Sequence, residues 1–418
     1  MADIAGIGAI GRVLKISNYR NYTIGNFASQ LGMWVQRIAI AWLTWTLTES
    51  PFWLGVMAMA DFMPNLIFAP LAGALADRLD RLKAIRLYML ISACLSGAIA
   101  ALTITDLITI HILLVLVLAN GITMSFNYPV RLSIIHALVG RETLTTAISI
   151  NAIVFNIARI GGPVLSGQMI SHLGIGPAVA FTVFADLVFV VMLYLVTMAP
   201  KTDESTEASA KNLSAEIIEG FRYVASHKGI GPLLFILAFY SIFGRTFIEL
   251  FPAFSDTVFN KAEEGLAMLT SVLGVGSLVG SLFLARIQGV NGLTRILIFN
   301  VLLSSIAVIA FASTDVYVAA LFCTFIVGIA IVMIGVIEQT LLQASVDSAM
   351  RGRVLSFYTL IARGCPSLGA LLMGWLATYF GLQWPVASGA IACLGLWFWA
   401  WRQQVNLARH LEVRPDEK

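Results

Sequence analysis

Charged residues are scarce in this chain, and their scarcity excludes most soluble folds. Asp, Glu, Lys and Arg make up 12% of the 418 residues, whereas soluble domains carry about 25%. The formal net charge is only +3 and the basic residues are not clustered, so a nucleic-acid partner is not expected. The four cysteines show neither CxxC spacing nor a neighbouring histidine, so the sequence predicts neither a metal site nor a disulfide framework.

Sequence signatures of enzymes are also missing. The chain has no GxxxxGKS or GxxxxGKT phosphate loop, which argues against ATP-driven work. No set of serine, histidine and acidic residues falls in its polar segments, so we expect no catalytic site and no cofactor. The N-terminus lacks the short apolar region and small-residue cleavage site of a cleavable signal peptide.

Long apolar runs are what the chain has instead. Hydrophobic residues make up 59% of it, and the mean hydropathy is +0.87. Because about 20 apolar residues cross the hydrocarbon core of a bilayer, these runs predict an all-α polytopic membrane protein with twelve spanning helices. The predicted spans are 22–48, 53–76, 84–105, 107–128, 144–171, 177–198, 230–254, 265–286, 295–314, 316–341, 353–380 and 384–402.

The basic residues predict how the chain is oriented. With twelve spans, those outside the spans lie in alternate loops and both terminal segments, and the opposite loops hold Lys261 as their only basic residue. Because cytoplasmic loops carry an excess of Lys and Arg, both termini are expected in the cytoplasm. An odd number of spans would destroy this segregation, so the count and the orientation support each other.

One polar segment divides the chain. Residues 200–230 form the only sizeable hydrophilic stretch, and the apolar spacing in its second part predicts an amphipathic helix on the cytoplasmic face. A plain tether between two halves fits the same segment. It separates an N-terminal six-helix half, residues 1–199, from a C-terminal six-helix half, residues 231–418.

The two halves repeat one another. Gly121–Val139 aligns without gaps to Gly328–Val346 at an offset of 207, and Arg37 matches Arg245 at an offset of 208. Such repeats predict two bundles related by a pseudo-two-fold axis, with a substrate site between them near the bilayer midplane.

These features resemble a known family. Residues 73–83, GALADRLDRLK, resemble the GxxxDRxGRR/K loop of the major facilitator superfamily, with Asp80 where the pattern has glycine. Residues 41–55, 127–151 and 339–358 resemble the bacterial efflux branch that contains the enterobactin exporter and macrolide-efflux proteins. The resemblance covers most of the chain. It implies a multi-pass exporter of the bacterial cytoplasmic (inner) membrane.

The resemblance assigns a conformational latch to the charged loop. It implies that Asp77 meets the N-terminal end of the eleventh helix near Arg353 when the transporter faces outward, where the helix dipole favours a carboxylate. Alternatively, these charges are topology signals only. The latch candidates are Gly73, Asp77, Arg78, Arg81, Lys83 and Arg353.

A second motif lies in the span 144–171. GPVLSG, residues 162–167, resembles the GPxxGG motif of antiporters, with Ser166 in place of the first paired glycine. Gly162, Pro163 and Gly167 therefore have two possible roles. One is a proline kink that limits inward leakage, and the other is close packing of small residues against a neighbouring helix.

Ionisable residues inside the spans are the best site candidates, because such residues usually face a cavity. Arg37 and Asp61 are expected to pair, and Glu249 follows Arg245 by one α-helical turn on the same face. Asp186 falls on a helix that the resemblance makes peripheral, so it is set aside. The candidates for substrate or proton binding are Trp34, Arg37, Asp61, Arg159, Tyr240, Arg245, Glu249 and Arg363, and the gate candidates are Arg131 and Glu338.

We therefore expect a secondary exporter of small amphipathic or anionic molecules, drugs or siderophores among them, driven by a proton gradient and working as a monomer. Asp61 or Glu249 is expected to carry the proton in exchange for the substrate. Three alternatives stay open: a dedicated siderophore exporter, a lysolipid flippase, and a membrane scaffold or sensor that transports nothing.

Overall fold

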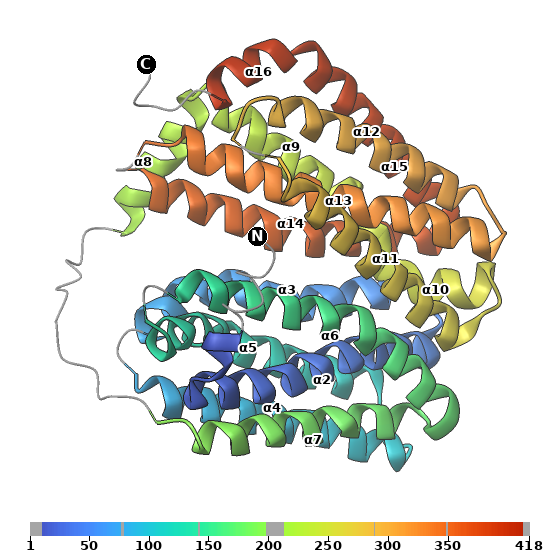
Figure 1. Ribbon diagram of the computed structural model, residues 1–418. Coiled ribbons are helices and arrows are strands. Elements are labelled where there is room, and N and C mark those ends of the chain that lie inside the picture. The colour runs from blue at the N-terminus through green and yellow to red at the C-terminus, as the bar shows by residue number, and fades with distance from the viewer. Residues whose placement is uncertain are drawn as a thin grey trace. The chain divides into compact units, whose positions relative to one another are not determined.

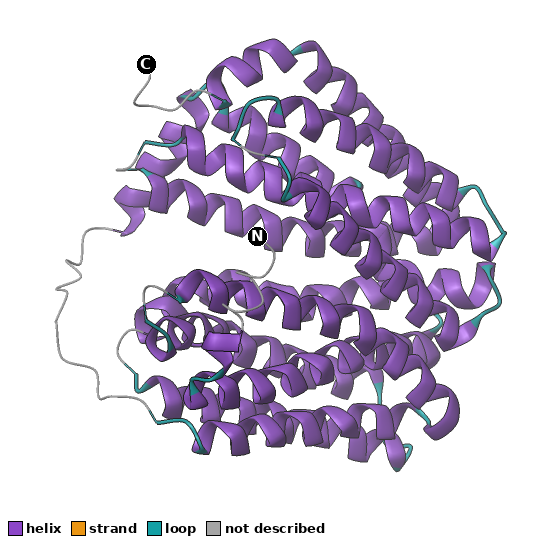
Figure 2. Cartoon of the chain, in the orientation of Figure 1, coloured by secondary structure: helices purple, strands orange, loops and turns teal. Residues whose placement is uncertain are grey.

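The protein is built from helices. The computed structural model describes residues 11–76, 79–140, 143–197, 213–287, 289–347 and 350–412, and these ranges contain no strand (Figure 1 and Figure 2). The all-α fold predicted from the sequence is confirmed. The helices are α2 (Ser17–Thr48), α3 (Pro51–Ala76), α4 (Arg81–Ile104), α5 (Ile110–Leu138), α6 (Leu144–Leu173), α7 (Ile175–Tyr194), α8 (Leu213–Ser226), α9 (Ile230–Phe243), η1 (Thr246–Leu250), α10 (Phe251–Ala253), η2 (Phe254–Val258), α11 (Ala262–Leu284), α12 (Leu293–Ala312), α13 (Tyr317–Ser345), α14 (Arg351–Phe380), α15 (Gln383–Arg402) and α16 (Gln404–Leu411).

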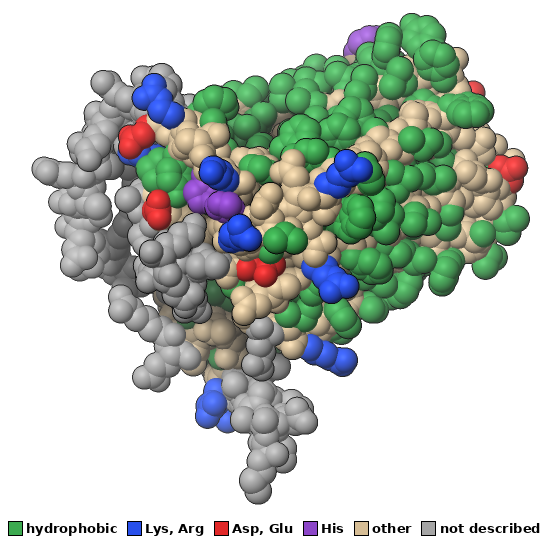
Figure 3. All heavy atoms as spheres, turned by 90° about the horizontal axis from the view of Figure 1, so that it is seen from above, with side chains coloured by type: hydrophobic (Ala, Val, Ile, Leu, Met, Phe, Trp, Pro, Cys, Tyr) green, Lys and Arg blue, Asp and Glu red, His purple; other side chains and the backbone are tan. Residues whose placement is uncertain are grey.

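Eleven helical segments of the described chain are long and apolar enough to cross a membrane. On the face drawn in Figure 3, hydrophobic side chains cover most of the surface, and Lys and Arg gather toward one end. The predicted first span, α2, is not among the eleven. Its mean hydropathy is lowered by polar side chains that point inward, because Asn26, Ser29, Gln36 and Thr44 are all buried.

The chain folds as two compact units, here described separately. Unit 1 comprises Met1–Glu49, Met57–Lys201 and Ser255–Ser271, and unit 2 comprises Ser50–Val56, Thr202–Phe254 and Val272–Lys418. In unit 1, α2 packs against α6 and α7, and α4 packs against α5 and α7. Glycine makes the contact between α2 and α7 possible, because a Cβ on Gly32 would come within 2.8 Å of Ala185 Cβ.

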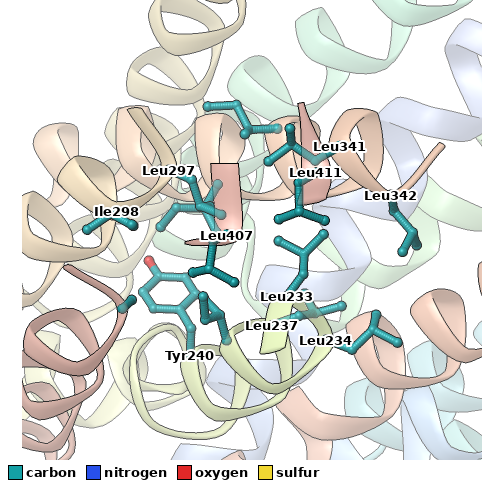
Figure 4. Close-up of a cluster of buried hydrophobic side chains, with 14 of the residues drawn as sticks. Leu233, Leu234, Leu237, Tyr240, Leu297, Ile298, Leu341, Leu342, Leu407 and Leu411 are labelled. Carbon is teal, nitrogen blue, oxygen red and sulfur yellow. The ribbon is translucent and has the colours of Figure 1, made fainter. Parts of the chain in front are cut away.

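Unit 2 is organised around α12, α13 and α9. Helix α12 packs against α13 and α15, and α9 packs against α14 and α15. Their apolar faces form one buried cluster, in which Figure 4 shows Tyr240, Leu297 and Leu407. Leu407 belongs to the short helix α16, which the sequence analysis did not predict. The carboxylate of Glu412, directly after α16, accepts hydrogen bonds from the backbone N–H groups of Gly292 and Thr294, both at 2.8 Å, and so caps α12.

The helix bounds repeat along the chain as the sequence does. Helices α5 and α13 each have 29 residues, and α6 and α14 each have 30, with starting residues 207 apart in both pairs. The equivalence matters for the site because it places Arg131 of α5 and Glu338 of α13 at corresponding positions.

The predicted span 230–254 is not one continuous α-helix. Helix α9 ends at Phe243, η1 is a 3-10 helix, and η2 is a π-helix. The assumption that Glu249 lies one α-helical turn from Arg245 is therefore wrong, because Arg245 precedes a 3-10 turn. Interrupted membrane helices commonly surround binding sites in transporters.

Candidate functional site

A chain of hydrogen bonds joins two buried charges inside unit 1. Arg131 Nη2 donates to Ser29 Oγ at 2.8 Å, and Ser29 Oγ donates to Asp186 Oδ1 at 3.0 Å. Ser92 Oγ donates to the second carboxylate oxygen of Asp186, also at 3.0 Å. Asp186 is 3% exposed. We call Ser29, Ser92, Arg131 and Asp186 the Arg131–Asp186 network, in which opposite charges compensate each other away from water.

Further contacts fix the guanidinium of Arg131. Its Nη1 donates to Asn26 Oδ1 at 3.3 Å, and Asn26 Nδ2 donates to Asn151 Oδ1 at 3.0 Å. The guanidinium carbon lies 4.8 Å from the ring centroid of Phe189, a distance at which a cation is attracted to the ring. Side chains from α2, α4, α5, α6 and α7 thus meet around one polar cluster.

The structure corrects one expectation here, the position of Arg131, and adds the partners of Asp186. Arg131 was predicted to follow the span 107–128, but it lies inside α5, which continues to Leu138. The helix continues through Pro129, and Asn127 just before it is only 2% exposed and faces the interior. Asp186, set aside as a site candidate because its helix was expected to be peripheral, is buried within the Arg131–Asp186 network, and its exclusion from the candidates stays a prediction. Serines in otherwise apolar spans, Ser29 and Ser92, were the signal that the sequence analysis missed.

Unit 2 holds the second buried carboxylate of the described residues. Glu338 on α13 is 1% exposed, and neither of its carboxylate oxygens has a hydrogen-bond partner. The positive charge of Arg245 acts on Glu338, and also on Tyr240 and Tyr358. The side chain that was predicted as a gate therefore faces the core of unit 2.

The hydroxyl groups of the two tyrosines near Glu338 form hydrogen bonds with other residues. The hydroxyl of Tyr240 lies 2.7 Å from Ser304 Oγ, and the hydroxyl of Tyr358 donates to the carbonyl oxygen of Gly335 at 3.0 Å. Tyr240 is 2% exposed. It therefore lies in the core of unit 2, and its predicted role in substrate or proton binding stays a prediction.

A cation held against aromatic rings forms another candidate site in unit 1. The guanidinium carbon of Arg37 lies 5.0 Å from the ring centroid of Phe62 and 5.8 Å from that of Trp34. Trp34 also meets Phe155 edge to face, with centroids 6.0 Å apart. Trp34 Nε1 is buried and donates no hydrogen bond to the described residues. We call Trp34, Arg37, Phe62 and Phe155 the Arg37 aromatic site.

The remaining intramembrane candidates are half-buried. Asp61 directly precedes Phe62 on α3, and its predicted pairing with Arg37 stays a prediction. Arg159 lies on α6 in unit 1, and Arg363 lies on α14 in unit 2. Glu249 lies within η1.

The charged loop shows why aspartate replaces the glycine of the superfamily pattern. The side chain of Asp80 accepts hydrogen bonds from the backbone N–H groups of Leu82 and Lys83, at 3.0 and 3.1 Å, and so caps α4. The Nζ of Lys83 is 4.0 Å from Asp80 Oδ2, but both side chains are exposed, so this pair contributes little stability. Arg81 begins α4, and Gly73 lies within α3.

The cap predicts a graded effect of substitution. Asp80→Ala should lower the free energy of unfolding by about 0.5–2 kcal/mol, whereas Asp80→Gly should cost only a few tenths. Equilibrium unfolding of the purified variants in detergent measures both values. Equal losses in the two variants would contradict a capping role.

The latch partner Arg353 contacts the linker helix. Arg353 Nη1 lies 2.8 Å from Glu219 Oε2 of α8, and the hydroxyl of Tyr223 on α8 donates to Asp347 Oδ2 at 2.9 Å. Helix α8 lies in the predicted linker, and these two contacts attach it to the start of α14 and the segment after α13. Asp77 and Arg78 lie outside the described residues, so the latch itself stays a prediction.

The GPVLSG motif packs α6 onto α2. Pro163 lies inside α6 without ending it, and Ser166 Oγ donates to the carbonyl oxygen of Val35 at 2.9 Å. A Cβ on Gly162 would overlap Trp34 Cβ, and one on Gly167 would come within 2.6 Å of Ala267 Cβ. The packing role of this motif therefore has direct structural support.

Two adjacent glycines make a matched test of that packing. Gly162→Ala should cost about 1–3 kcal/mol of stability through overpacking and should displace Trp34. Gly161→Ala should neither lower stability nor displace Trp34, because a Cβ there has no neighbour within 4 Å. Thermal unfolding of the two variants in detergent compares them. Identical melting temperatures would exclude a tight contact at Gly162.

Comparisons with known proteins agree with this architecture. A family model described as transmembrane secretion effector matches residues 13–417. The staphyloferrin A transporter of Staphylococcus aureus (strain NCTC 8325 / PS 47) is 23% identical over 359 residues, covering 85% of this chain and 89% of its own length. Macrolide efflux protein A of Streptococcus pyogenes is 22% identical over 383 residues, covering 90% and 94%. The crystal structure of the nucleoside transporter NupG matches with a TM-score of 0.72 at 13% identity, covering 92% of this chain and 98% of that chain.

Proposed function

Because this chain belongs to the transmembrane secretion effector family, an efflux-type branch of the major facilitator superfamily, we propose that it exports small amphipathic or anionic molecules in exchange for protons. Members of this superfamily are transport proteins rather than enzymes. The site of action is the bacterial cytoplasmic membrane, with both termini in the cytoplasm, in keeping with the distribution of Lys and Arg along the chain.

The Arg37 aromatic site carries the proposal for the substrate. It offers a guanidinium, two aromatic rings beside it, and one buried indole N–H that donates to no described residue. Guanidinium groups bind carboxylates through paired hydrogen bonds, and aromatic rings bind flat apolar surface. An anion with an apolar body satisfies all three features.

Export against a gradient needs a source of energy, and the proposed source is the flow of protons. The chain lacks a nucleotide-binding loop, so export against a gradient needs the flow of an ion. A carboxyl group inside the membrane can bind and release a proton at each turn of an alternating-access cycle.

Transport in proteoliposomes tests this function. Staphyloferrin A and a macrolide are offered outside vesicles whose lumen is acidic, and we expect faster initial uptake than in vesicles without a pH gradient. An ionophore that collapses the gradient should abolish the difference. Equal rates in all three conditions would remove proton antiport. If no probe were transported and none raised the melting temperature, the scaffold or sensor would be favoured.

A dedicated siderophore exporter is the second candidate, favoured by the relative named for staphyloferrin A. A deletion strain grown under iron limitation should then secrete less siderophore than its parent. Normal secretion would eliminate this candidate and leave the broader exporter, with the lysolipid flippase tested by fluorescent lysolipid translocation in the same vesicles.

A further inference from the structure

The two buried carboxylates of the described residues are held very differently. Asp186 accepts hydrogen bonds from Ser29 and Ser92, and Ser29 joins it to Arg131. Glu338 accepts none at either oxygen, although it is the more deeply buried of the two. Buried polar groups are nearly always hydrogen-bonded, so the unpartnered carboxylate requires an explanation.

The surroundings of Glu338 are apolar apart from a few titratable groups. Its own helix contributes Ile334, Ile337 and Leu341 to the buried cluster of unit 2. The titratable and charged groups whose charges act on Glu338, or on the tyrosines beside it, come from three neighbouring segments. They are Tyr240 on α9, Arg245 directly after α9, Tyr358 on α14 and Cys393 on α15.

Neither protonation state of Glu338 is fully satisfied in this environment. An ionised carboxylate lacks the hydrogen-bond donors that stabilise a buried charge, although Arg245 lies near enough to compensate it. A neutral carboxyl group needs no counter-charge, but it no longer offsets the positive charge of the half-buried Arg245. A residue for which each protonation state has one compensating feature can change protonation during a transport cycle.

We propose that Glu338 binds the proton that is exchanged for substrate, with Arg245 as its counter-charge after the proton leaves. In that step the carboxyl O–H bond breaks, both electrons stay on the carboxylate, and the proton passes to water that reaches the residue in the open state. The break between Phe243 and Thr246 lets Arg245 move relative to α13. The role in exchange rests on the proposed antiport, whereas protonation of Glu338 itself does not.

Infrared spectroscopy tests protonation without any substrate. Difference spectra of the purified full-length protein across a pH titration should contain the carbonyl stretch of a protonated carboxyl group, shifted in heavy water. Glu338→Gln should lose this band, and the exposed control Asp315→Asn should keep it. Glu338→Asp, which should retain a shifted band, guards against a loss caused by misfolding. A band that persists in Glu338→Gln, or that disappears only in Asp186→Asn, would overturn the proposal.

Vesicle transport tests the coupling. For whichever of staphyloferrin A or the macrolide is transported by the wild type, Glu338→Gln should bring the ratio of rates with and without the pH gradient to about one, because a neutral amide does not distinguish the two sides. Exchange of labelled for unlabelled probe should continue. Loss of coupling in Asp61→Asn or Glu249→Gln, but not in Glu338→Gln, would also overturn the proposal. A wild type indifferent to the gradient would instead refute the antiport function, and the infrared result would still decide whether Glu338 is protonated.

Discussion

Replacing Arg131 with methionine is expected to destabilise the protein by about 3–5 kcal/mol, because it removes the positive charge that compensates a buried carboxylate through Ser29. The charge left behind is Asp186, which is 3% exposed. Methionine retains the length and apolar bulk of the arginine stem, so the loss reports the charge and its hydrogen bonds more than a cavity. Equilibrium unfolding in detergent gives the value.

A double-mutant cycle measures the coupling between Arg131 and Asp186 separately from the contribution of each residue alone. The double variant Arg131→Met, Asp186→Leu contains neither charge and should recover much of the stability lost by either single variant, since apolar replacements of buried pairs are often neutral or better. The exposed control Arg20→Met should stay within about 0.5 kcal/mol of wild type. If the two single losses simply added in the double variant, the network would not couple these residues.

Equivalent positions in the repeat carry opposite charges, and each unit compensates its own. Arg131 on α5 is joined through Ser29 to Asp186 on α7. The charge of Arg245, two residues after the end of α9, acts on Glu338 of α13. Both carboxylate oxygens of Asp186 accept hydrogen bonds, whereas those of Glu338 accept none from the described residues. The repeat therefore keeps a charge at this position but not its hydrogen-bonding environment. This difference is why we assign a structural role to Asp186 and a proton-binding role to Glu338.

Much of the fold could be predicted because hydrophobicity and charge act over whole segments. Membrane-length apolar runs predict where most of the long helices lie, and the 207-residue offset recurs in the bounds of α5 and α13. Local hydrogen bonding was harder to predict. The early end of α9 at Phe243 and the continuation of α5 past Pro129 depend on which backbone groups find partners inside the bundle.

Individual charged candidates could be recognised, but their partners could not. Arg131, Glu338 and Arg245 stand out because ionisable residues are rare in apolar helices. Pairing depends on which faces of separate helices meet, and the sequence carries no direct record of that. The partners of Asp186 could therefore not be predicted from its own helix, because the serines that donate to it lie on α2 and α4.

Replacing Arg37 with alanine should weaken binding of an anionic probe by roughly 10–150-fold, because a hydrogen bond to a charged group contributes about 1.5–3 kcal/mol. Affinity for staphyloferrin A, measured by calorimetry on purified protein, provides the test. Arg37→Lys should give an intermediate loss, since lysine keeps the charge but lacks the planar group that stacks on Trp34 and Phe62.

The indole offers a finer control on the same site. Trp34→Phe keeps an aromatic ring beside Arg37 but removes the buried N–H, so it should lower affinity only for ligands that accept a hydrogen bond there. All three variants must have melting temperatures near that of the wild type, so that a lower affinity is not the result of lost stability. If Arg37→Ala and Arg37→Lys both kept the wild-type affinity, the anion would bind at another site. Arg245, the repeat equivalent of Arg37, would then be the next cation to replace, although its charge already faces Glu338.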